Sequence, residues 1–469
     1  MSFYRILFVV LEMSMLFHNN VYSQNNADKP DSLLISDIII EGNKKTKEHI
    51  ILRELLFKKG DMIDAGSLEY LKTKSEENLL NTSLFNFVTI EIIPEYRSVQ
   101  IVILLQERWY VWPYPVLEQA DRNFSSFLRN QEWSRIDYGL FVLVNNFRGH
   151  KEILKLKMIF GYNNRFALYC YKPFVDKQQK VGFGIDIDFF RNHEVPFNIL
   201  KSELIYLKMN DSYARKTLKL SNFYTYRPHL YTSHLLNIKF STIWVADSVF
   251  ALNNQYFWDN TNEVSFFTLG YIYNYDKRDS KVYPLTGYRI FLSAVKNGLG
   301  VVTDKGNFEV KSVLEKNIKI HPKFYANTSL IGSINFSNQK SFYFSEAIGY
   351  NNYLRGMEYY VTNGESYYIS KTNLKYEILP QTKLNLNFIP TDKFSKVHIA
   401  LYANVFMDTG YANSEFSTAN SIANEFLYSG GFGIDFVTYY DKVLRIEYSL
   451  NKFGEHGIFV HLGAPIIEK

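Results

Sequence analysis

The most constraining feature of this sequence is a long series of segments in which apolar and polar residues alternate with a period of two. In residues 181–189 every odd position is Val, Phe or Ile, whereas Asp186 and Asp188 occupy the opposite face of the strand. Residues 154–160 and 444–450 repeat this pattern, and their polar faces also carry full charges. Many such segments run for about ten residues, the length that a tilted strand needs to cross a bilayer.

The number of these segments and the charge on their polar faces predict the fold class. Between fourteen and eighteen candidate strands lie between Ile136 and Gly463. A soluble β-sandwich or propeller is the alternative, but its strands are shorter and its inner face is dry and apolar. Only a closed barrel satisfies every backbone group of a β-structure in lipid. We therefore predict an antiparallel transmembrane β-barrel with a wet lumen over residues 131–469.

The amino terminus predicts export from the cytoplasm. Residues 1–23 have the order of a signal peptide, because Arg5 precedes an apolar run from Ile6 to Phe17 and small residues precede Gln24. Glu12 interrupts the run, and a poorly ordered amphipathic tail is the alternative. The expected cleavage site lacks a cysteine, so we expect no lipid anchor. No later apolar run reaches the ~18 residues of a membrane-spanning helix.

The amino-acid composition indicates which kinds of surface and ligand suit this chain. Aromatic residues make up 17% of the chain, with 36 tyrosines among them. Tyrosine is apolar on its ring and polar at its hydroxyl, so it suits membrane interfaces and binding surfaces. A net charge of +5 is too small to indicate nucleic acid, and Cys170 alone cannot form an internal disulfide or a multi-cysteine metal site. We expect no metal and no cofactor.

A small α+β domain precedes the predicted barrel. Residues 34–108 predict the order β-α-α-β-β, with Thr46 as the cap of the first helix. Residues 109–130 follow as an aromatic and proline-rich segment, which begins at Trp109. We expect this segment to be a connector at the edge of an aromatic girdle, with a carbohydrate-binding strip as the alternative.

These residues resemble a known family. Gly42, Gly60, Asp61 and Phe85, together with the element order, are similar to a POTRA domain. POTRA domains precede the barrel in the BamA/TamA superfamily of outer-membrane assembly and translocation proteins. Further segments resemble barrel motifs of that superfamily in the expected order. They are a mid-barrel motif with Asp276, Arg278, Asp279, Pro284 and Gly287, a loop tip Leu354-Arg355-Gly356-Met357, the strand Tyr376-Glu377-Ile378-Leu379-Pro380, and the strand Phe406-Met407-Asp408-Thr409-Gly410.

The resemblance implies an electrostatic site inside the barrel. It places Arg355 in the lumen, paired with carboxylates of the inner wall, which map onto Glu377 and Asp408. A guanidinium offers a planar fork of donors that a carboxylate accepts, and Gly356 would permit the tight turn that presents it. Without the resemblance, the same residues would fit an exposed loop and an ordinary turn.

The resemblance also implies a function and a location. It implies sixteen strands in a bacterial outer membrane, surrounded by outer-membrane lipid, with the POTRA domain in the periplasm. It implies that the protein inserts or translocates unfolded client proteins, which it would recruit, with or without a periplasmic partner, at the POTRA domain. The barrel would have a weak seam between its first strand, near 137–145, and its last, near 457–463. No enzyme activity and no nucleic acid are expected.

Several residues depart from the family pattern or suggest other functions. Met357 replaces an aromatic residue, the final residues 464–469 lack a terminal aromatic, and the chain has room for one POTRA domain, which favours an accessory member. A passive or gated pore is the alternative function. An outer-membrane hydrolase that uses Asp186 and Asp188 is a weaker one. Residues 430–433 form a glycine cluster inside a strand pattern, which indicates curvature or close packing rather than a phosphate loop.

Overall fold

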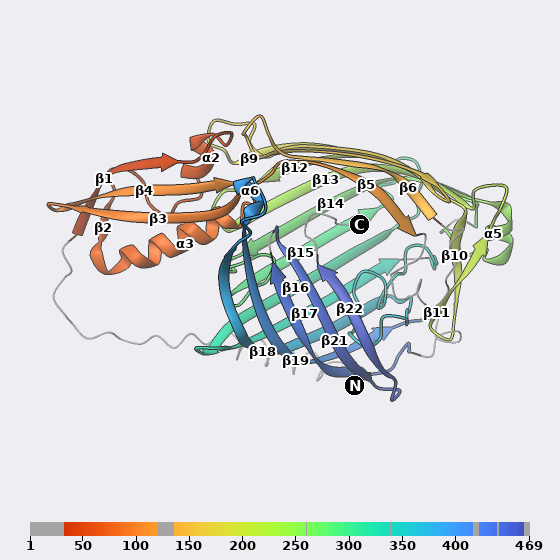
Figure 1. Ribbon diagram of the computed structural model, residues 1–469. Helices are drawn as coiled ribbons and strands as arrows, with labels where there is room; N and C mark the ends of the chain where they lie inside the picture. The colour runs from red at the N-terminus through yellow and green to blue at the C-terminus, as the bar shows by residue number, and fades with distance from the viewer. Residues whose placement is uncertain are drawn as a thin grey trace.

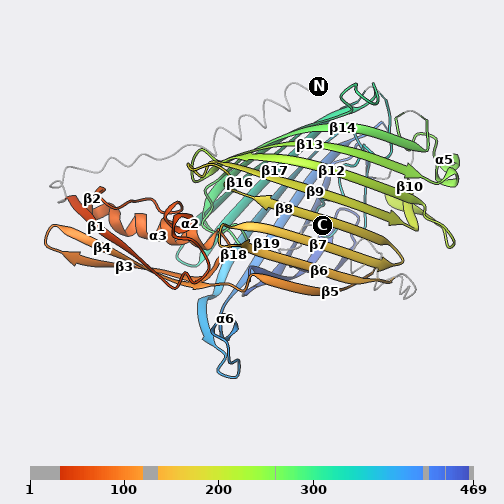
Figure 2. The ribbon, with the colours of Figure 1, turned by 90° about the horizontal axis from the view of Figure 1, so that it is seen from above.

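The computed structural model describes residues 32–119, 136–258, 260–337, 339–415, 422–438 and 440–463. The expected signal peptide, residues 1–23, lies outside these ranges. A small amino-terminal domain lies beyond one end of a large curved sheet (Figures 1 and 2). Within the described ranges, no helix is both long and apolar enough to cross a membrane.

The amino-terminal domain is a four-stranded sheet with helices on one side. Its strands follow the order β2-β1-β4-β3, and β1 runs parallel to β4. Its fully buried side chains include Ile35, Leu79 and Ile101. The elements are β1 (Ser32–Glu41), α2 (Glu48–Leu52), β2 (Met62–Asp64), a 3₁₀ turn (Ala65–Ser67), α3 (Leu68–Leu80), β3 (Phe85–Glu95) and β4 (Ser98–Glu107). The β-α-α-β-β order of the sequence analysis is confirmed, with β2 as a short addition.

One sheet of sixteen antiparallel strands forms the rest of the chain, which confirms the expected strand number. Its strands pair in chain order, except that β9 pairs directly with β12. They are β5 (Val111–Gln119), β6 (Ile136–Phe147), β7 (Glu152–Gly161), β8 (Asn164–Lys172), β9 (Val181–Asn192), β12 (Arg215–Tyr226), β13 (Thr232–Val245), β14 (Glu263–Asp276), β15 (Gly287–Asn297), β16 (Asn307–His321), β17 (Phe324–Ser337), β18 (Ser366–Asn385), β19 (Lys396–Asn413), β20 (Leu427–Thr438), β21 (Lys442–Asn451) and β22 (His456–Gly463).

The period-two pattern of the sequence becomes the two faces of this sheet. Phe183 and Tyr448 lie on its outer face, where they are exposed, as lipid-facing groups of a barrel are. Asp188 and Glu447 lie on the enclosed face, where the polypeptide buries them. The inner wall is therefore polar and charged, as the alternation predicts.

The barrel begins earlier in the chain than the sequence analysis expects. Residues Val111–Gln119, within the expected connector, form β5, the first strand of the large sheet. Pro113 and Pro115 obscure this strand in the sequence because proline cannot donate a ladder hydrogen bond. The structure accommodates both prolines because β5 is an edge strand that pairs with β6 alone in the described sheet.

Additional elements cover the end of the barrel farther from the amino-terminal domain. The hairpin of β10 (Glu194–Leu200) and β11 (Glu203–Lys208) forms a sheet of its own. It packs with α5 (Asp247–Leu252) and with aromatic side chains that include Tyr256 and Phe342. At the opposite end, α6 (Asp392–Ser395) caps the long hairpin of β18 and β19.

The outward orientation of β19 side chains gives a test of the barrel. Val405 lies on the outer face near the middle of β19. We expect Val405→Lys to destabilise the folded barrel by about 2–4 kcal/mol, because a charge near the bilayer midplane loses its hydration. Val405→Leu is the matched control and should change little. Urea unfolding in lipid vesicles measures both, and equal stability of the two variants would contradict the assignment of this face to lipid.

Candidate functional site

A loop between β17 and β18, residues 339–365, carries Arg355 into the lumen. The Arg355 Nε donates to Asp408 Oδ2 at 2.9 Å, and its Nη2 donates to Asp408 Oδ1 at 2.5 Å. The backbone N–H of Arg355 donates to the same carboxylate at 3.0 Å. Both side chains are almost fully shielded from solvent, with exposed fractions of 6% and 0%. The tip of the loop is thus held by a bidentate ion pair of the kind that Arg and carboxylate form best.

Packing around Arg355 explains why small residues surround it. The guanidinium carbon lies 3.9 Å from the centre of the Phe406 ring, and that ring lies against Gly431 of β20. A Cβ on Gly431 would lie 2.8 Å from the Phe406 ring, so this glycine provides close packing, as the cluster suggested. Gly356 has a φ of +79°, the conformation of the expected tight turn. Met357 is buried in an apolar cluster with Leu354, in place of the family's aromatic residue.

Glu377 does not meet Arg355, which is a correction to the expected pairing. Glu377 and Lys371 both face inward from β18 and are six residues apart. Asp408 of β19 lies opposite Lys371. At about 3.3 Å per residue, that separation is about 20 Å along the strand. Glu377 instead accepts a long hydrogen bond of 3.5 Å from Tyr325. The second carboxylate near Arg355 is Glu447 of β21, at 3.3 Å from Nη1.

The mid-barrel motif forms a second loop, residues 277–286, that also folds into the lumen. Arg278 pairs with Asp276 at 2.8 Å and with Glu315 of β16 at 3.0 Å. The Asp279 carboxylate accepts from the backbone N–H groups of Ser280 and Leu285, which closes the loop on itself.

Two contacts tie the tip of this second loop to the barrel wall. The Tyr283 hydroxyl donates to Asp435 of β20 at 2.7 Å, and the Pro284 carbonyl accepts from Lys375 at 3.2 Å. Gly287 follows with a φ of +94° where the chain enters β15. The motif residues of the sequence analysis therefore build one inserted loop.

A chain of asparagine amides connects the two loops along the inner wall. Arg355 Nη1 donates to Asn373, Asn373 donates to Asn327, and Asn327 donates to Asn317, over distances of 2.6, 2.9 and 2.6 Å. Asn317 then donates to Glu315, the partner of Arg278. The tip of the first loop and the base of the second thus belong to one hydrogen-bonded network that crosses three strands.

The amino-terminal domain contacts the barrel through charged groups at the near end. Glu54 is buried there and accepts two hydrogen bonds from Arg227, in the turn between β12 and β13, at 2.6 and 2.7 Å. Burial alone raises the pKa of the Glu54 carboxyl, but the hydrogen bonds and positive charge of Arg227 outweigh burial and lower this pKa to about 2. The same interactions raise the pKa of Arg227.

A second buried pair and a polar cluster complete this contact, which we call the docking interface. Arg108 donates to both oxygens of Asp441, in the turn before β21, at 2.5 and 2.8 Å. Its Nε donates to the carbonyl of Phe85, whose ring is fully buried in the domain core. The Thr46 hydroxyl donates to Glu107 and accepts from Asn146 of β6, so it does not cap α2 as expected.

The other three signature positions of this domain lie at turns. Gly42 follows β1, and Gly60 and Asp61 form the turn that precedes β2. The Asp61 carboxylate accepts from the backbone N–H of Lys58 at 2.7 Å and so closes that turn. These residues shape the domain and lie outside the docking interface.

A comparison with protein families identifies the amino-terminal domain, and solved structures resemble the fold of the chain. Residues 33–108 match the POTRA family, described as a surface antigen variable number repeat. The outer membrane protein assembly factor BamA of Nitratidesulfovibrio vulgaris is 30% identical over 73 residues, which are 16% of this chain and 9% of that protein. The chain therefore matches a small part of that relative's length.

Solved structures resemble the whole chain in fold. BamA from Haemophilus ducreyi lacking POTRA domains 1–3 matches with a TM-score of 0.51 and 14% identity, over 92% of this chain and 84% of that one. CdiB from Escherichia coli matches with a TM-score of 0.51 and 8% identity, over 98% and 97%. The chain thus carries a POTRA-family domain at residues 33–108, and its overall fold resembles those of BamA and CdiB.

The sequence alone does not point to the charged pairs between the POTRA domain and the barrel. Glu54 and Arg227 are 173 residues apart, and Arg108 and Asp441 are 333 apart. The one available signal is that Glu54 and Arg108 interrupt apolar stretches of a small domain, where a buried charge requires a partner. That signal does not name the partner.

Asp186 and Asp188 do not form a carboxylate dyad of the hydrolase kind. Asp188 accepts two hydrogen bonds from Arg165 at 2.9 and 2.8 Å, so an arginine already engages its carboxylate. Both aspartates face inward from β9, as the alternation predicts.

The Arg355 network gives a test with an internal control. We expect Arg355→Ala and Asp408→Ala each to destabilise the barrel by about 3–5 kcal/mol, because each leaves a buried charge without its partner. The double variant should cost less than the sum, with a coupling energy of about 0.5–3 kcal/mol. Glu377→Gln should have little effect. Urea unfolding in vesicles measures all four, and additive effects of the first two would contradict the pairing.

The Glu54 pair predicts a pH dependence of POTRA docking. Because the pKa of Glu54 is lowered from 4.5 to about 2, its contribution is complete above pH 4.5 and is lost as the pH falls toward 2. The lowered pKa of Glu54 corresponds to a stabilisation of the ionised carboxylate on the order of 3 kcal/mol. We expect Glu54→Gln to weaken docking at neutral pH and to remove most of the change below pH 4.5.

Pulsed electron paramagnetic resonance can measure that docking in a Cys170→Ser background. Spin labels at two exposed positions, Tyr96 of the POTRA domain and Leu156 of β7, would report the distance between the domain and the barrel. A single narrow distance distribution in Glu54→Gln at neutral pH would show that the pair does not hold the domain.

Proposed function

We propose that this protein assists the insertion or translocation of other proteins at the bacterial outer membrane, with its POTRA domain in the periplasm. The observation that carries the proposal is the arrangement of the two end strands of the large sheet. In the described part of the chain, β5 and β22 stand at opposite ends of the strand order and do not pair with each other. We call the gap between their edges the seam.

An unpaired strand edge is a template for another strand. Each such edge presents a row of N–H and C=O groups that an extended client segment can satisfy by strand addition. The edges of β5 and β22 would let a client strand extend the barrel wall from within the membrane. This assignment places the first seam strand at Val111–Gln119, before the segment near 137–145 that the sequence favoured.

The POTRA sheet offers a second free edge for recruitment. Its outer strand β3 pairs with β4 on one side in the described sheet order. The turn after β3 presents Tyr96, which is 92% exposed. We propose that clients or a periplasmic partner bind along β3, at the end of the barrel where the domain docks.

A passive pore is less consistent with the lumen. Two loops fold into it from the wall, and each is tied by buried ion pairs or hydrogen bonds. Both loops narrow the space available to a solute, whereas strand addition at the seam would leave their contacts intact.

Covalent closure of the seam tests the insertion mechanism. Cysteines introduced in β5 and β22 of the Cys170→Ser protein would be joined by a bis-maleimide. We expect the joined protein to lose its ability to restore client levels in a deletion strain, while either single-cysteine protein treated in the same way keeps it. Full restoration by the joined protein would exclude a role for seam opening.

Proteomic comparison of outer membranes with and without this protein distinguishes assembly from a pore. We expect a defined set of outer-membrane or exported proteins to disappear in the deletion strain. Unchanged protein levels together with a loss of solute conductance would favour the pore.

A further inference from the structure

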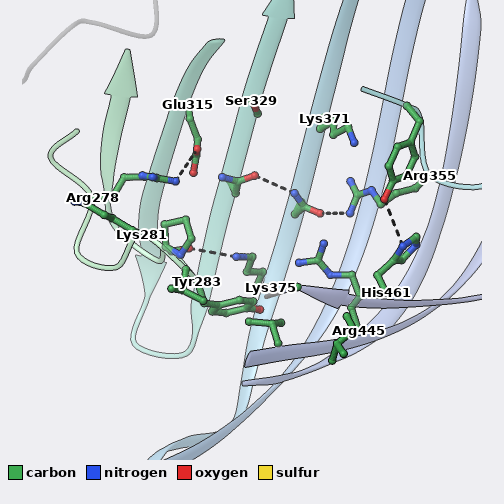
Figure 3. A pocket seen from close by; sticks show the side chains of 18 of the residues that line it. Arg278, Lys281, Tyr283, Glu315, Ser329, Arg355, Lys371, Lys375, Arg445 and His461 are labelled. Atoms are coloured by element: carbon green, nitrogen blue, oxygen red, sulfur yellow. Dashed lines mark hydrogen bonds and ion pairs between the residues drawn. The ribbon is translucent and has the colours of Figure 1, made fainter. Parts of the chain in front are cut away.

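A cavity of about 670 Å³ lies in the lumen between the two inserted loops (Figure 3). Its described lining contains one carboxylate, that of Glu315, and His461 of β22. The other charged side chains that line it are all basic. They are Arg278, Lys281, Arg355, Lys371, Lys375 and Arg445.

The three arginines of this cavity already have partners. Arg278 pairs with Asp276 and Glu315, and Arg355 pairs with Asp408 and Glu447. Arg445 pairs with Asp435 at 2.8 Å. These five carboxylates offset the three guanidinium charges and two of the three lysine charges, so the six basic side chains keep an excess of one positive charge over the acidic groups named here.

The three lysines lack such partners. None of them forms an ion pair with a carboxylate in the part of the chain that the structure describes. Lys375 donates to the Pro284 carbonyl and lies 3.9 Å from the centre of the Tyr283 ring, while Lys371 lies 4.7 Å from that of Tyr353. Lys375 is buried, and a buried ammonium without a counter-charge is costly. Their mutual repulsion adds to this cost.

An anion would compensate the remaining positive charge and give the lysine ammonium groups a direct partner. Lysine ammonium groups bind phosphate as compact point charges with rotatable donors. Lys371 and Lys375 lie on the same inward face of β18, and Lys281 comes from the opposing loop (Figure 3). A phosphate between them would receive donors from two sides.

The position of the cavity indicates where the rest of the ligand would lie. Four residues of β22 line it, and they come from both faces of that strand. His461 faces the lumen, where it lies near Tyr353, whereas Val460 and Leu462 are highly exposed on the outer face. The cavity therefore reaches β22, the strand that borders the seam, and the outer face of that strand is apolar.

We propose that this cavity binds the phosphate group of a membrane lipid, with its acyl chains passing the edge of β22 into the bilayer. Free phosphate shares the same chemistry, and the apolar edge is what favours a lipid. This site goes beyond the proposed function, because strand addition at the seam does not require a lipid phosphate in the lumen.

Native mass spectrometry of the full chain, purified in a phosphate-free non-ionic detergent, tests the proposal. The probes are dioleoyl phosphatidic acid, dioleoylglycerol, which lacks the phosphate, and inorganic diphosphate, which lacks the chains. We expect one retained phosphatidic acid per protein, with affinity at least tenfold above that for either other probe. Lys371→Gln with Lys375→Gln should lower this affinity at least tenfold, whereas arginine at both positions should preserve it.

A matched control distinguishes binding at this site from a general effect of positive charge in the lumen. Lys219 and Lys239 alternate with outward Leu220 and Ile238 and lie outside the cavity lining, so their replacement by Gln should leave binding unchanged. An equal loss in the control variant, or equal retention of dioleoylglycerol, would overturn the proposal. Equal affinity for diphosphate would show a free-phosphate site and overturn the lipid assignment. The comparison of the three probes on the unsubstituted protein tests the lipid-phosphate proposal even if a variant fails to fold.

Discussion

Charged side chains on the inner wall of the barrel require partners, and this requirement organises the whole molecule. An alternating strand that presents apolar groups to lipid must direct its polar groups inward. There, Asp408, Asp435 and Glu447 are buried, and an isolated charge in that position would be very costly. The inserted loops supply the missing charge or donor through Arg355 and Tyr283. Without the Arg355 loop, Asp408 would lose its arginine partner, whereas Asp435 also pairs with Arg445 of the wall itself.

Much of this fold could be predicted from the sequence because a period of two is a local property. The inward position of Asp188 and Glu447 follows from their strands alone. The partner of Arg355 was harder to predict, because two inward carboxylates differ only in depth along the barrel. That depth depends on the register between strands, which places Asp408 opposite Lys371 and leaves Glu377 about 20 Å away. Register is set by the assembled sheet, so a single strand's sequence does not contain it.

The first strand shows a different limit of sequence reasoning. The two prolines in β5 argue against a central strand, and a strand that contains them is tolerated at the edge of a sheet. Whether β5 is an edge strand is a property of the completed sheet. The docking interface shows the same dependence on assembly. Arg108 has no partner that the sequence identifies until the turn that carries Asp441 is placed beside it. Expectations drawn from one segment therefore succeed for faces and fail for partners.

The POTRA domain holds the near end of the seam. Arg108 lies three residues before β5, and its partner Asp441 immediately precedes β21, the strand whose Val443 pairs with Gly463 at the end of β22. The backbone N–H of Trp109 also donates to the Tyr440 hydroxyl in the same turn. The POTRA domain thus joins the start of β5 to the strand next to β22 across the seam at the near end. If the seam widens as the proposed function requires, the buried Arg108–Asp441 pair restrains that movement at the near end.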